Sequence, residues 1–165
     1  MMNRYSITAR RVALSALAAG AVALSTAAQA GDCPSDKRVA DGQGQKQATH
    51  AAKGVKDTVR SAIDLAHEAP QLKGRLFRLR QLDIEPGGIV PWHSHDERPA
   101  QIYVVKGTIT EYRSNCAVPI VHNAGDVAPE SKGTSHWWQN TGSEPVVLIS
   151  VDIFEDKPGA DKRMM

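Results

Sequence analysis

Short runs of alternating hydrophobic and polar residues fill the second half of the chain. These runs are rich in Ile, Val, Leu, Tyr and Trp, and they cover residues 75–84, 89–95, 101–106, 108–113, 118–122, 134–140 and 146–154. Turn-forming residues, mostly Gly, Pro, Asn and Asp, separate many of them, at 86–88, 107, 123–126 and 141–143. Many short strands at this spacing, with few helical patterns, predict an all-β sandwich or barrel.

The segment before these runs has a different pattern. Residues 31–55 are rich in Asp, Gln, Lys and Gly and contain few large apolar residues, which favours an extended arm or loop. Residues 55–72 have modest apolar content and fit either one short helix or an irregular edge strand. We therefore predict an N-terminal arm and pre-barrel segment at 31–74, a barrel at 75–155 and a polar C-terminal tail at 156–165.

The first 30 residues have the pattern of an export signal. Basic residues run to Arg11, an apolar stretch follows over residues 12–24, and Ala28-Gln29-Ala30 ends the segment. A basic head, an apolar middle and a small-x-small end are what signal peptidase recognises. The alternative is a buried core helix, but no polar face interrupts the apolar stretch. We expect cleavage after Ala30 and a periplasmic or secreted mature protein.

Length and charge limit the classes of protein. The 165 residues suit one ordinary domain. The export segment contains three arginines and no acidic residue, so the rest of the chain has 17 Lys and Arg against 18 Asp and Glu. This balance argues against a nucleic-acid partner. The apolar stretch is shorter than the roughly 20 residues that a membrane span needs, so we expect no membrane attachment after processing.

Two cysteines, Cys33 and Cys116, remain after removal of the signal. In an oxidising compartment such a pair usually forms one disulfide. The bond would close a loop of roughly 80 residues and stabilise the fold by ~4 kcal/mol. The alternative is two free buried thiols. No Cys-based zinc spacing is present in the sequence.

The residues with the clearest chemistry are His93, His95 and His136. The first two are separated by one residue in a strand-like run, so their side chains would point to the same face. His136 lies in another such run, where a neighbouring barrel strand would bring it opposite the pair. Three neutral imidazoles suit one divalent transition metal, Fe, Zn, Mn, Ni or Cu, and leave coordination positions open. The alternative for the pair alone is two surface residues.

These histidines lie in two segments that resemble the motifs of the cupin superfamily. The first motif reads Gly, five residues, His-x-His, three or four residues, Glu, six residues, Gly; here Gly87, His93, His95, Ala100 and Gly107 take those positions. The second reads Gly, five residues, Pro-x-Gly, two residues, His, three residues, Asn; its positions here are Gly125, Ser131, Gly133, His136 and Asn140. The resemblance extends over residues 75–154. This segment is similar to a group of small exported bacterial cupins. It implies a double-stranded β-helix, or jelly-roll, barrel, and commonly a homodimer.

The chain departs from the motifs at two positions. Ser131 replaces a proline, and Ala100 replaces the glutamate that is often the fourth metal ligand. Alternation puts Ala100 on the inward face and Gln101 outside, which favours a site of three histidines without a carboxylate. A one-residue bulge would instead make Gln101 the fourth ligand. Glu97, in the loop after His95, is a weaker substitute.

Other residues have two interpretations each. Trp138 shares the face of His136 and would either wall a pocket or pack in the core. Arg98 would either bind an anionic substrate or remain a solvated loop cation. We expect His50 and His67 to be solvated, and His122 to have no partner.

Two functions remain open from the sequence. The first is a metal-dependent enzyme of dioxygenase, isomerase or lyase type that acts on a small molecule, anionic or neutral. The second is a non-catalytic periplasmic cupin that binds a metal or small ligand. The sequence has no evident acid or base beside the three histidines, and the same fold hosts both kinds of function.

Overall fold

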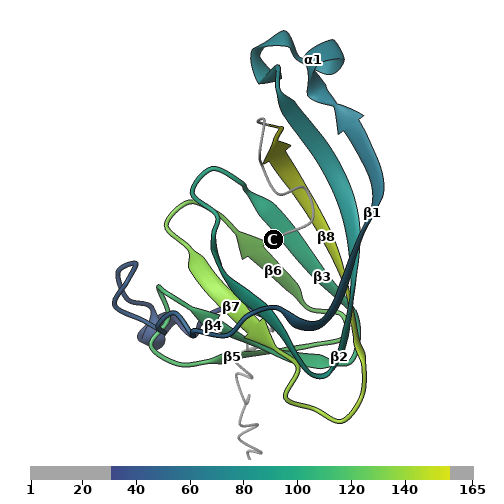
Figure 1. Ribbon diagram of the computed structural model, residues 1–165. Helices are drawn as coiled ribbons and strands as arrows, with labels where there is room; N and C mark the ends of the chain where they lie inside the picture. Colours follow the sequence, from purple (N-terminus) through teal and green to yellow (C-terminus); the bar gives the residue numbers. More distant parts are fainter. Residues whose placement is uncertain (1–30, 157–165) are drawn as a thin grey trace, which may run out of the picture.

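The computed structural model describes residues 31–156 of the chain (Figure 1). The predicted export signal and the tail beyond residue 156 lie outside the described residues. The described strands are β1 (Lys53–Asp64), β2 (Arg75–Ser94), β3 (Ala100–Lys106), β4 (Thr108–Arg113), β5 (Ile120–Asn123), β6 (Val127–Glu130), β7 (Ser135–Gln139) and β8 (Val146–Glu155). The helical segments are short: η1 (Ser35–Lys37), α1 (Leu65–Glu68) and η2 (Pro70–Leu72).

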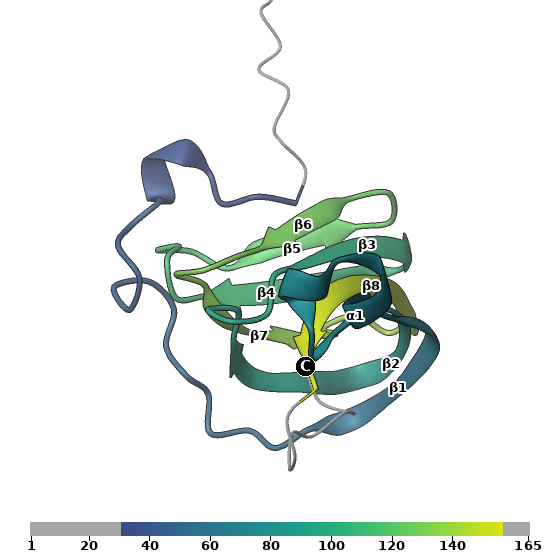
Figure 2. The ribbon, with the colours of Figure 1, turned by 90° about the horizontal axis from the view of Figure 1, so that it is seen from above.

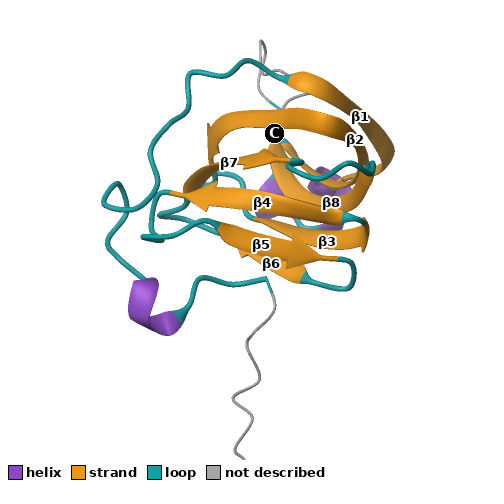
Figure 3. Cartoon of the chain, turned by 90° about the horizontal axis from the view of Figure 1, so that it is seen from below, coloured by secondary structure: helices purple, strands orange, loops and turns teal. Residues whose placement is uncertain are grey.

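The strands form one antiparallel sheet that curls into a nearly closed barrel. Its order is β5–β4–β7–β2–β8–β3–β6, and β1 pairs with β2 outside this path. The two ends of the order, β5 and β6, are joined by the turn at residues 124–126 and do not pair with each other, so the barrel is nearly closed; Figures 2 and 3 show it from its two ends. The predicted all-β barrel is confirmed. Among the described residues no helix is long and apolar enough to cross a membrane.

The pre-barrel segment contains the edge strand that the sequence left as one of two alternatives. β1 runs antiparallel to β2, with Asp64 opposite Leu76 and Lys53 opposite Ile89. The helical alternative applies only to α1 and η2, which join β1 to β2. The hairpin of β1 and β2 extends beyond the rest of the sheet, with α1 at its tip (Figure 1).

Strand β2 serves two parts of the barrel. The sequence predicted separate strands at 75–84 and 89–95, but the structure has one strand of 20 residues. Its first half pairs with β8 as far as Ile84, and its second half pairs with β7 from Ile89 onward. The strand therefore passes from one side of the barrel to the other, and this brings the His-x-His segment next to β7.

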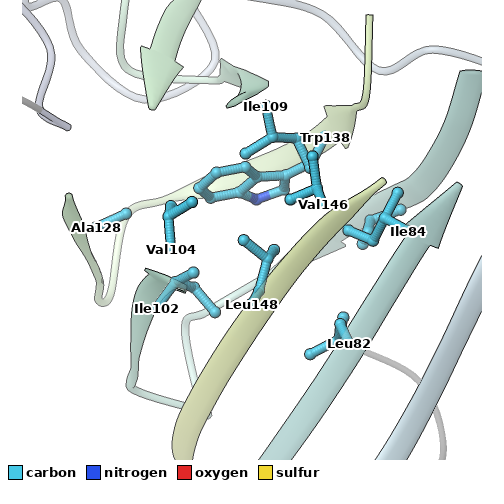
Figure 4. Packing of buried hydrophobic residues seen from close by; sticks show 10 residues of the cluster. Leu82, Ile84, Ile102, Val104, Ile109, Ala128, Trp138, Val146 and Leu148 are labelled. Atoms are coloured by element: carbon cyan, nitrogen blue, oxygen red, sulfur yellow. The ribbon is translucent and has the colours of Figure 1, made fainter. Parts of the chain in front are cut away.

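The core fills one end of the barrel interior. It contains Leu82, Ile84, Val90, Ile102, Val104, Ile109, Ala128, Trp138, Val146 and Leu148, all at most 2% exposed (Figure 4). These side chains come from facing strands and alternate with outward residues, as a half-buried sheet requires. Burying large apolar side chains contributes about 1.5–3 kcal/mol each, so this end of the barrel supplies much of the stability.

Two motif residues act in turns. Gly107 joins β3 to β4 with φ +85°, and a Cβ there would lie 2.9 Å from Val146 Cγ2. Both facts favour glycine. Asn140 is fully buried, and its amide donates hydrogen bonds to the backbone oxygens of Ile84, Glu85 and Glu144 at 3.2, 3.1 and 2.8 Å. It therefore holds the loops that close the apolar end.

The arm is fixed to the barrel by the predicted disulfide. Cys33 and Cys116 are bonded, and both are buried with Ile120 in a small apolar cluster. Arg38 forms an isolated β-bridge with Cys116. The alternative of two free thiols is excluded in this structure.

Candidate metal centre

The barrel interior changes from apolar to charged along each of several strands. On β2 the inward residues Leu82 and Ile84 give way to Arg78 and Arg80 toward the other end. On β8 Asp152 follows Leu148 and Ser150 in the same way, and on β6 Glu130 follows Ala128. The same end holds the three predicted histidines. Since buried charges need partners, we expect the functional site at this polar end of the barrel.

The three histidines meet at this polar end. His93 on β2 is directly opposite His136 on β7, and His95 follows the end of β2. The Nε2 atom of His136 lies 3.0 Å from Nε2 of His93 and 3.0 Å from Nε2 of His95. The structure therefore brings together the three histidines that the sequence predicted. Strand alternation places His93 and His95 on one face, and the pairing of β2 with β7 brings His136 to them.

The other ring nitrogen of each histidine has an oxygen partner. Nδ1 of His93 is 2.8 Å from the Pro91 carbonyl oxygen, and Nδ1 of His95 is 2.7 Å from that of Arg98. Nδ1 of His136 contacts Glu111 Oε1. Because a carbonyl or carboxylate oxygen can only accept, each Nδ1 carries the proton and donates. In the neutral rings the three Nε2 atoms then present bare lone pairs to one another, the arrangement that a cation stabilises.

Burial keeps the rings of His93 and His95 neutral. The pKa of His93 lies well below its ordinary value because the ring is desolvated and His136 and His95 are close. Desolvation and the neighbouring His136 lower the pKa of His95 to about 3. Neutral imidazole is the form that binds a metal, so these two ligands need no deprotonation at physiological pH.

A carboxylate reaches the histidines from a position that the sequence analysis did not consider. Glu130, at the end of β6, has Oε2 3.2 Å from Nε2 of His95 and Oε1 3.2 Å from Nε2 of His136. Both oxygens are buried without a hydrogen-bond donor among the described residues. Burial raises the pKa of Glu130 to about 7. An uncompensated buried carboxylate facing bare nitrogens fits a bound cation.

Register explains why Glu130 replaces the missing motif glutamate. Its Cα is paired directly with that of Ala100, the residue at the motif position. Directly opposite side chains on the same face of a sheet are close neighbours. A carboxylate thus approaches the histidines from the adjacent strand, so Glu130 is a further candidate ligand beside the predicted three-histidine group. Its sequence signal was slight: Glu130 directly precedes the second motif's Ser131.

The alternative fourth ligands do not reach the histidines. Gln101 is exposed on the outer face of β3, while Ala100 faces inward and is 8% exposed. The strand has no bulge between Ala100 and Tyr103, so Gln101 stays on the face away from the histidines. The side chain of Glu97 is exposed in the loop after His95.

A second carboxylate, Glu111, orients His136 from behind. It is fully buried and accepts hydrogen bonds from His136, from His122 Nε2 at 2.9 Å and from Arg113 Nε at 2.9 Å. Although burial opposes ionisation, these bonds and the Arg113 charge hold the pKa of Glu111 well below its ordinary value. His122, expected to have no partner, is therefore a buried member of this group. Such outer partners fix the orientation and tautomer of a metal-binding histidine.

The remaining candidates separate clearly. Trp138 packs in the apolar core, and its ring centroid lies 5.6 Å from that of His136. Core packing is thus its main role. Arg98 is not a solvated loop cation, because its side chain is 12% exposed and Nη1 lies 3.7 Å from Asp152 Oδ2. His50 and His67 are exposed, as expected.

This combination of a jelly-roll barrel with converging histidines defines a cupin. Residues 80–152 match the family model of the cupin domain (Cupin_2). The barrel is also similar to a "predicted oxalate decarboxylase" from Thermotoga maritima, with a TM-score of 0.52 and 20% identity over 74% of this chain and 98% of that one. A double-stranded β-helix protein from Klebsiella pneumoniae has a TM-score of 0.51 and 18% identity over 68% of this chain and 87% of that one. The chain belongs to the cupin superfamily.

Curated relatives are similar over part of the chain. Germin-like protein 5-1 of Oryza sativa subsp. japonica is 31% identical over 84 residues, 48% of this chain and 36% of that protein. Auxin-binding protein ABP19b of Prunus persica is 30% identical over 87 residues, 51% of this chain and 42% of that protein. The chain spans less than half the length of these relatives.

Proposed function

We propose that the protein binds one divalent transition metal through His93, His95, His136 and Glu130. The observation that carries this proposal is the convergence of three Nε2 atoms at 3.0 Å with every Nδ1 already donating. The unpartnered Glu130 oxygens support it independently. Imidazole nitrogens with one carboxylate suit Fe, Mn, Zn, Ni or Cu rather than Ca or Mg.

We propose further that the centre is catalytic and acts on a small molecule. When bound, such an ion supplies Lewis-acid or oxygen-activating chemistry. The protein contributes three neutral, oriented imidazoles and, from Glu130, one carboxylate whose charge would partly compensate that of the ion. Four protein ligands would leave a six-coordinate ion two positions for substrate or water.

The competing function is a cupin that binds a metal or ligand without catalysis. One observation favours it: Glu111, the other carboxylate of the group, already accepts three hydrogen bonds and is committed to structure. If Glu130 is also fully occupied as a ligand, the described site lacks a separate acid or base. Metal-dependent turnover of a small organic compound decides for the enzyme.

Metal content tests the centre itself. We expect one transition-metal ion per chain in protein isolated without added metal or chelator. The His93→Ala/His95→Ala variant should lose it, while the matched control His67→Ala, at an exposed position on α1, should retain it. Full metal content in a folded double variant would refute the assignment, and circular dichroism reports whether the barrel is intact.

We also propose export and removal of residues 1–30. The Cys33–Cys116 disulfide supports an oxidising compartment, since such bonds are rare in the cytosol. Intact mass of the purified native protein should correspond to a chain that starts at Gly31. A full-length chain in the cytosol would contradict this proposal.

A homodimer is proposed as the assembly. The outer sheet face carries exposed apolar side chains on three strands, with Phe77 and Leu79 on β2, Tyr103 and Val105 on β3 and Val127 on β6. Exposed apolar patches of this kind commonly mark protein interfaces. Light scattering should give twice the chain mass, and Tyr103→Glu should yield monomers. A monomeric wild-type protein at micromolar concentration would reject the dimer.

A further inference from the structure

The imidazole of His122, on β5 behind the metal centre, has one ring nitrogen without a partner. Its Nε2 atom lies 2.9 Å from Glu111 Oε2, and because a carboxylate can only accept, Nε2 carries the proton. In the neutral ring Nδ1 is then an acceptor. This atom is buried and has no hydrogen-bond partner among the described residues. Since buried polar atoms are normally paired, this acceptor fits a donor that reaches it from a neighbouring segment.

The segment next to this acceptor begins with Gly31, the first described residue. Gly31 is buried and has φ +87°. A Cβ built on it would lie 2.8 Å from the Val127 carbonyl oxygen, 3.2 Å from His122 Nδ1 and 3.2 Å from Asp126 Cβ. The first distance is too short for a carbon atom, but 2.8 and 3.2 Å are ordinary distances between a nitrogen donor and its acceptors. The position beside Gly31 Cα therefore suits a nitrogen better than a methyl group.

Cleavage of the chain would supply that nitrogen. Hydrolysis after Ala30 turns the amide nitrogen of Gly31 into a free α-ammonium group, which no preceding peptide bond holds in place. Glycine has no side chain, so a turn of about 120° about its Cα–C bond exchanges the nitrogen with the hydrogen in the Cβ direction. Residues from Asp32 onward do not move in this rotation. The α-ammonium group then donates to the Val127 carbonyl oxygen and to His122 Nδ1.

Charge and anchoring favour the same placement. Asp126 is buried, and its carboxyl group is attached to the Cβ atom that lies 3.2 Å from the position beside Gly31. A buried ammonium group needs a compensating negative charge of this kind. Two residues along the chain, Cys33 is bonded to Cys116 and is buried. The disulfide therefore holds the start of the arm against β5 and β6, so the amino group has little freedom to leave.

We propose that removal of residues 1–30 creates an α-ammonium group at Gly31 that docks against His122 Nδ1, the Val127 carbonyl oxygen and Asp126. The inference rests on the proposed cleavage after Ala30, and its consequence for metal binding rests on the proposed metal centre. Processing thereby completes a site that the uncleaved chain leaves without its donor.

The docked amino group acts on the metal centre through two residues. His122 Nε2 donates to Glu111, and Glu111 accepts the hydrogen bond of His136 Nδ1. With Nδ1 of His122 occupied as an acceptor, Nε2 keeps its proton and its bond to Glu111. Glu111 then stays oriented toward His136, and such outer partners raise the metal affinity of a histidine ligand. Gly31 is thus a positioning residue, and the processed chain binds metal more tightly than the unprocessed one.

Reaction of the exported native protein with an aldehyde selective for α-amines, followed by peptide mass spectrometry, tests the docking. We expect the Gly31 amine to react at least about tenfold more slowly in the folded protein than in urea, because a buried group reacts only after local opening. A chain with one serine inserted between Ala30 and Gly31 carries its amine one residue further out and should show no such difference. Asp126→Asn keeps an acceptor for the Asn123 amide but removes the charge, so its amine should react faster. Asp36→Asn, at an exposed position on η1, removes the same charge and should react as wild type.

Chelator competition with zinc on the same proteins tests the link to His136. The serine-extended chain should bind zinc about threefold more weakly than the native chain, or weaker still, because His122 loses the donor that fixes it. Equal zinc affinity of the two chains would overturn the link.

A chain that begins at Gly31 and whose amine reacts equally fast folded and unfolded would overturn the docking. Equal protection of the serine-extended chain would also overturn it. A native chain that begins at another residue would instead overturn the proposed cleavage, and this inference with it. A native protein that takes up no zinc would overturn the metal centre and the link to it, while the labelling still decides the docking.

Discussion

Replacement of Glu130 by glutamine should make the metal-free protein more stable at high pH. Burial raises the pKa of this carboxyl group from 4.5 to about 7. The folded state therefore keeps a proton that the unfolded chain releases between these two pH values, and stability falls as pH rises through this window. At about 1.4 kcal/mol per pH unit, the loss amounts to ~3 kcal/mol above pH 7. Glutamine does not titrate, so the variant does not lose this unfolding free energy as the pH rises.

Urea denaturation of chelator-treated proteins at pH 4.5, 6 and 8 measures this effect. The unfolding free energy of Glu130→Gln relative to wild type should rise by ~3 kcal/mol from pH 4.5 to pH 8. His95, with its pKa lowered to about 3, makes both proteins lose stability as pH falls below its ordinary value of 6.5. This contribution has the opposite sign but is common to both proteins, so the difference between them isolates Glu130.

The same comparison with metal should reverse the order. An ion that binds the ionised Glu130 stabilises the folded wild type in proportion to its affinity, and the glutamine variant should gain less. Glu68→Gln, at an exposed helical position, is the control for loss of one acidic residue. A difference between variant and wild type that does not change with pH would show that Glu130 is solvated or already ionised in the metal-free protein, which contradicts a buried carboxyl group with a raised pKa.

Three further outcomes are expected. Cys33→Ser/Cys116→Ser should lower the unfolding free energy by up to ~4 kcal/mol in a denaturation series, since the disulfide closes a loop of 83 residues' separation; an unchanged midpoint would contradict this. Glu111→Gln should weaken metal binding by about 10–100-fold in a chelator competition, because it removes the charged acceptor behind His136; equal affinity would deny it an orienting role. Glu130→Ala should lose metal affinity, and the double variant Ala100→Glu/Glu130→Ala should recover it, because the two positions are paired. No recovery would show that position 100 does not face the ion.

The sequence predicted those parts of the site that depend on local periodicity. Strand alternation was enough to place His93 and His95 on one face and to put Ala100 inside and Gln101 outside. The spacing of the second motif was enough to select His136, and the redox argument was enough to pair Cys33 with Cys116.

The parts that were missed depend on pairing between distant strands. Glu130 reaches the histidines only because β6 is paired with β3 at Ala100, and Glu111 reaches His136 only because β4 lies beside β7. The partner of His122 was missed for the same reason, since β5 brings it to Glu111. Local periodicity does not determine such registers, which are set by the complete packing of the barrel.

The most direct test of the metal centre is a crystal structure of the metal-loaded protein with anomalous diffraction at the absorption edge of the bound ion. We expect one anomalous peak per chain, within about 2.0–2.2 Å of Nε2 of His93, His95 and His136 and of a Glu130 oxygen if the ion is zinc. A fully occupied ion elsewhere, or an ion at the three histidines with Glu130 turned away from it, would contradict the proposed centre.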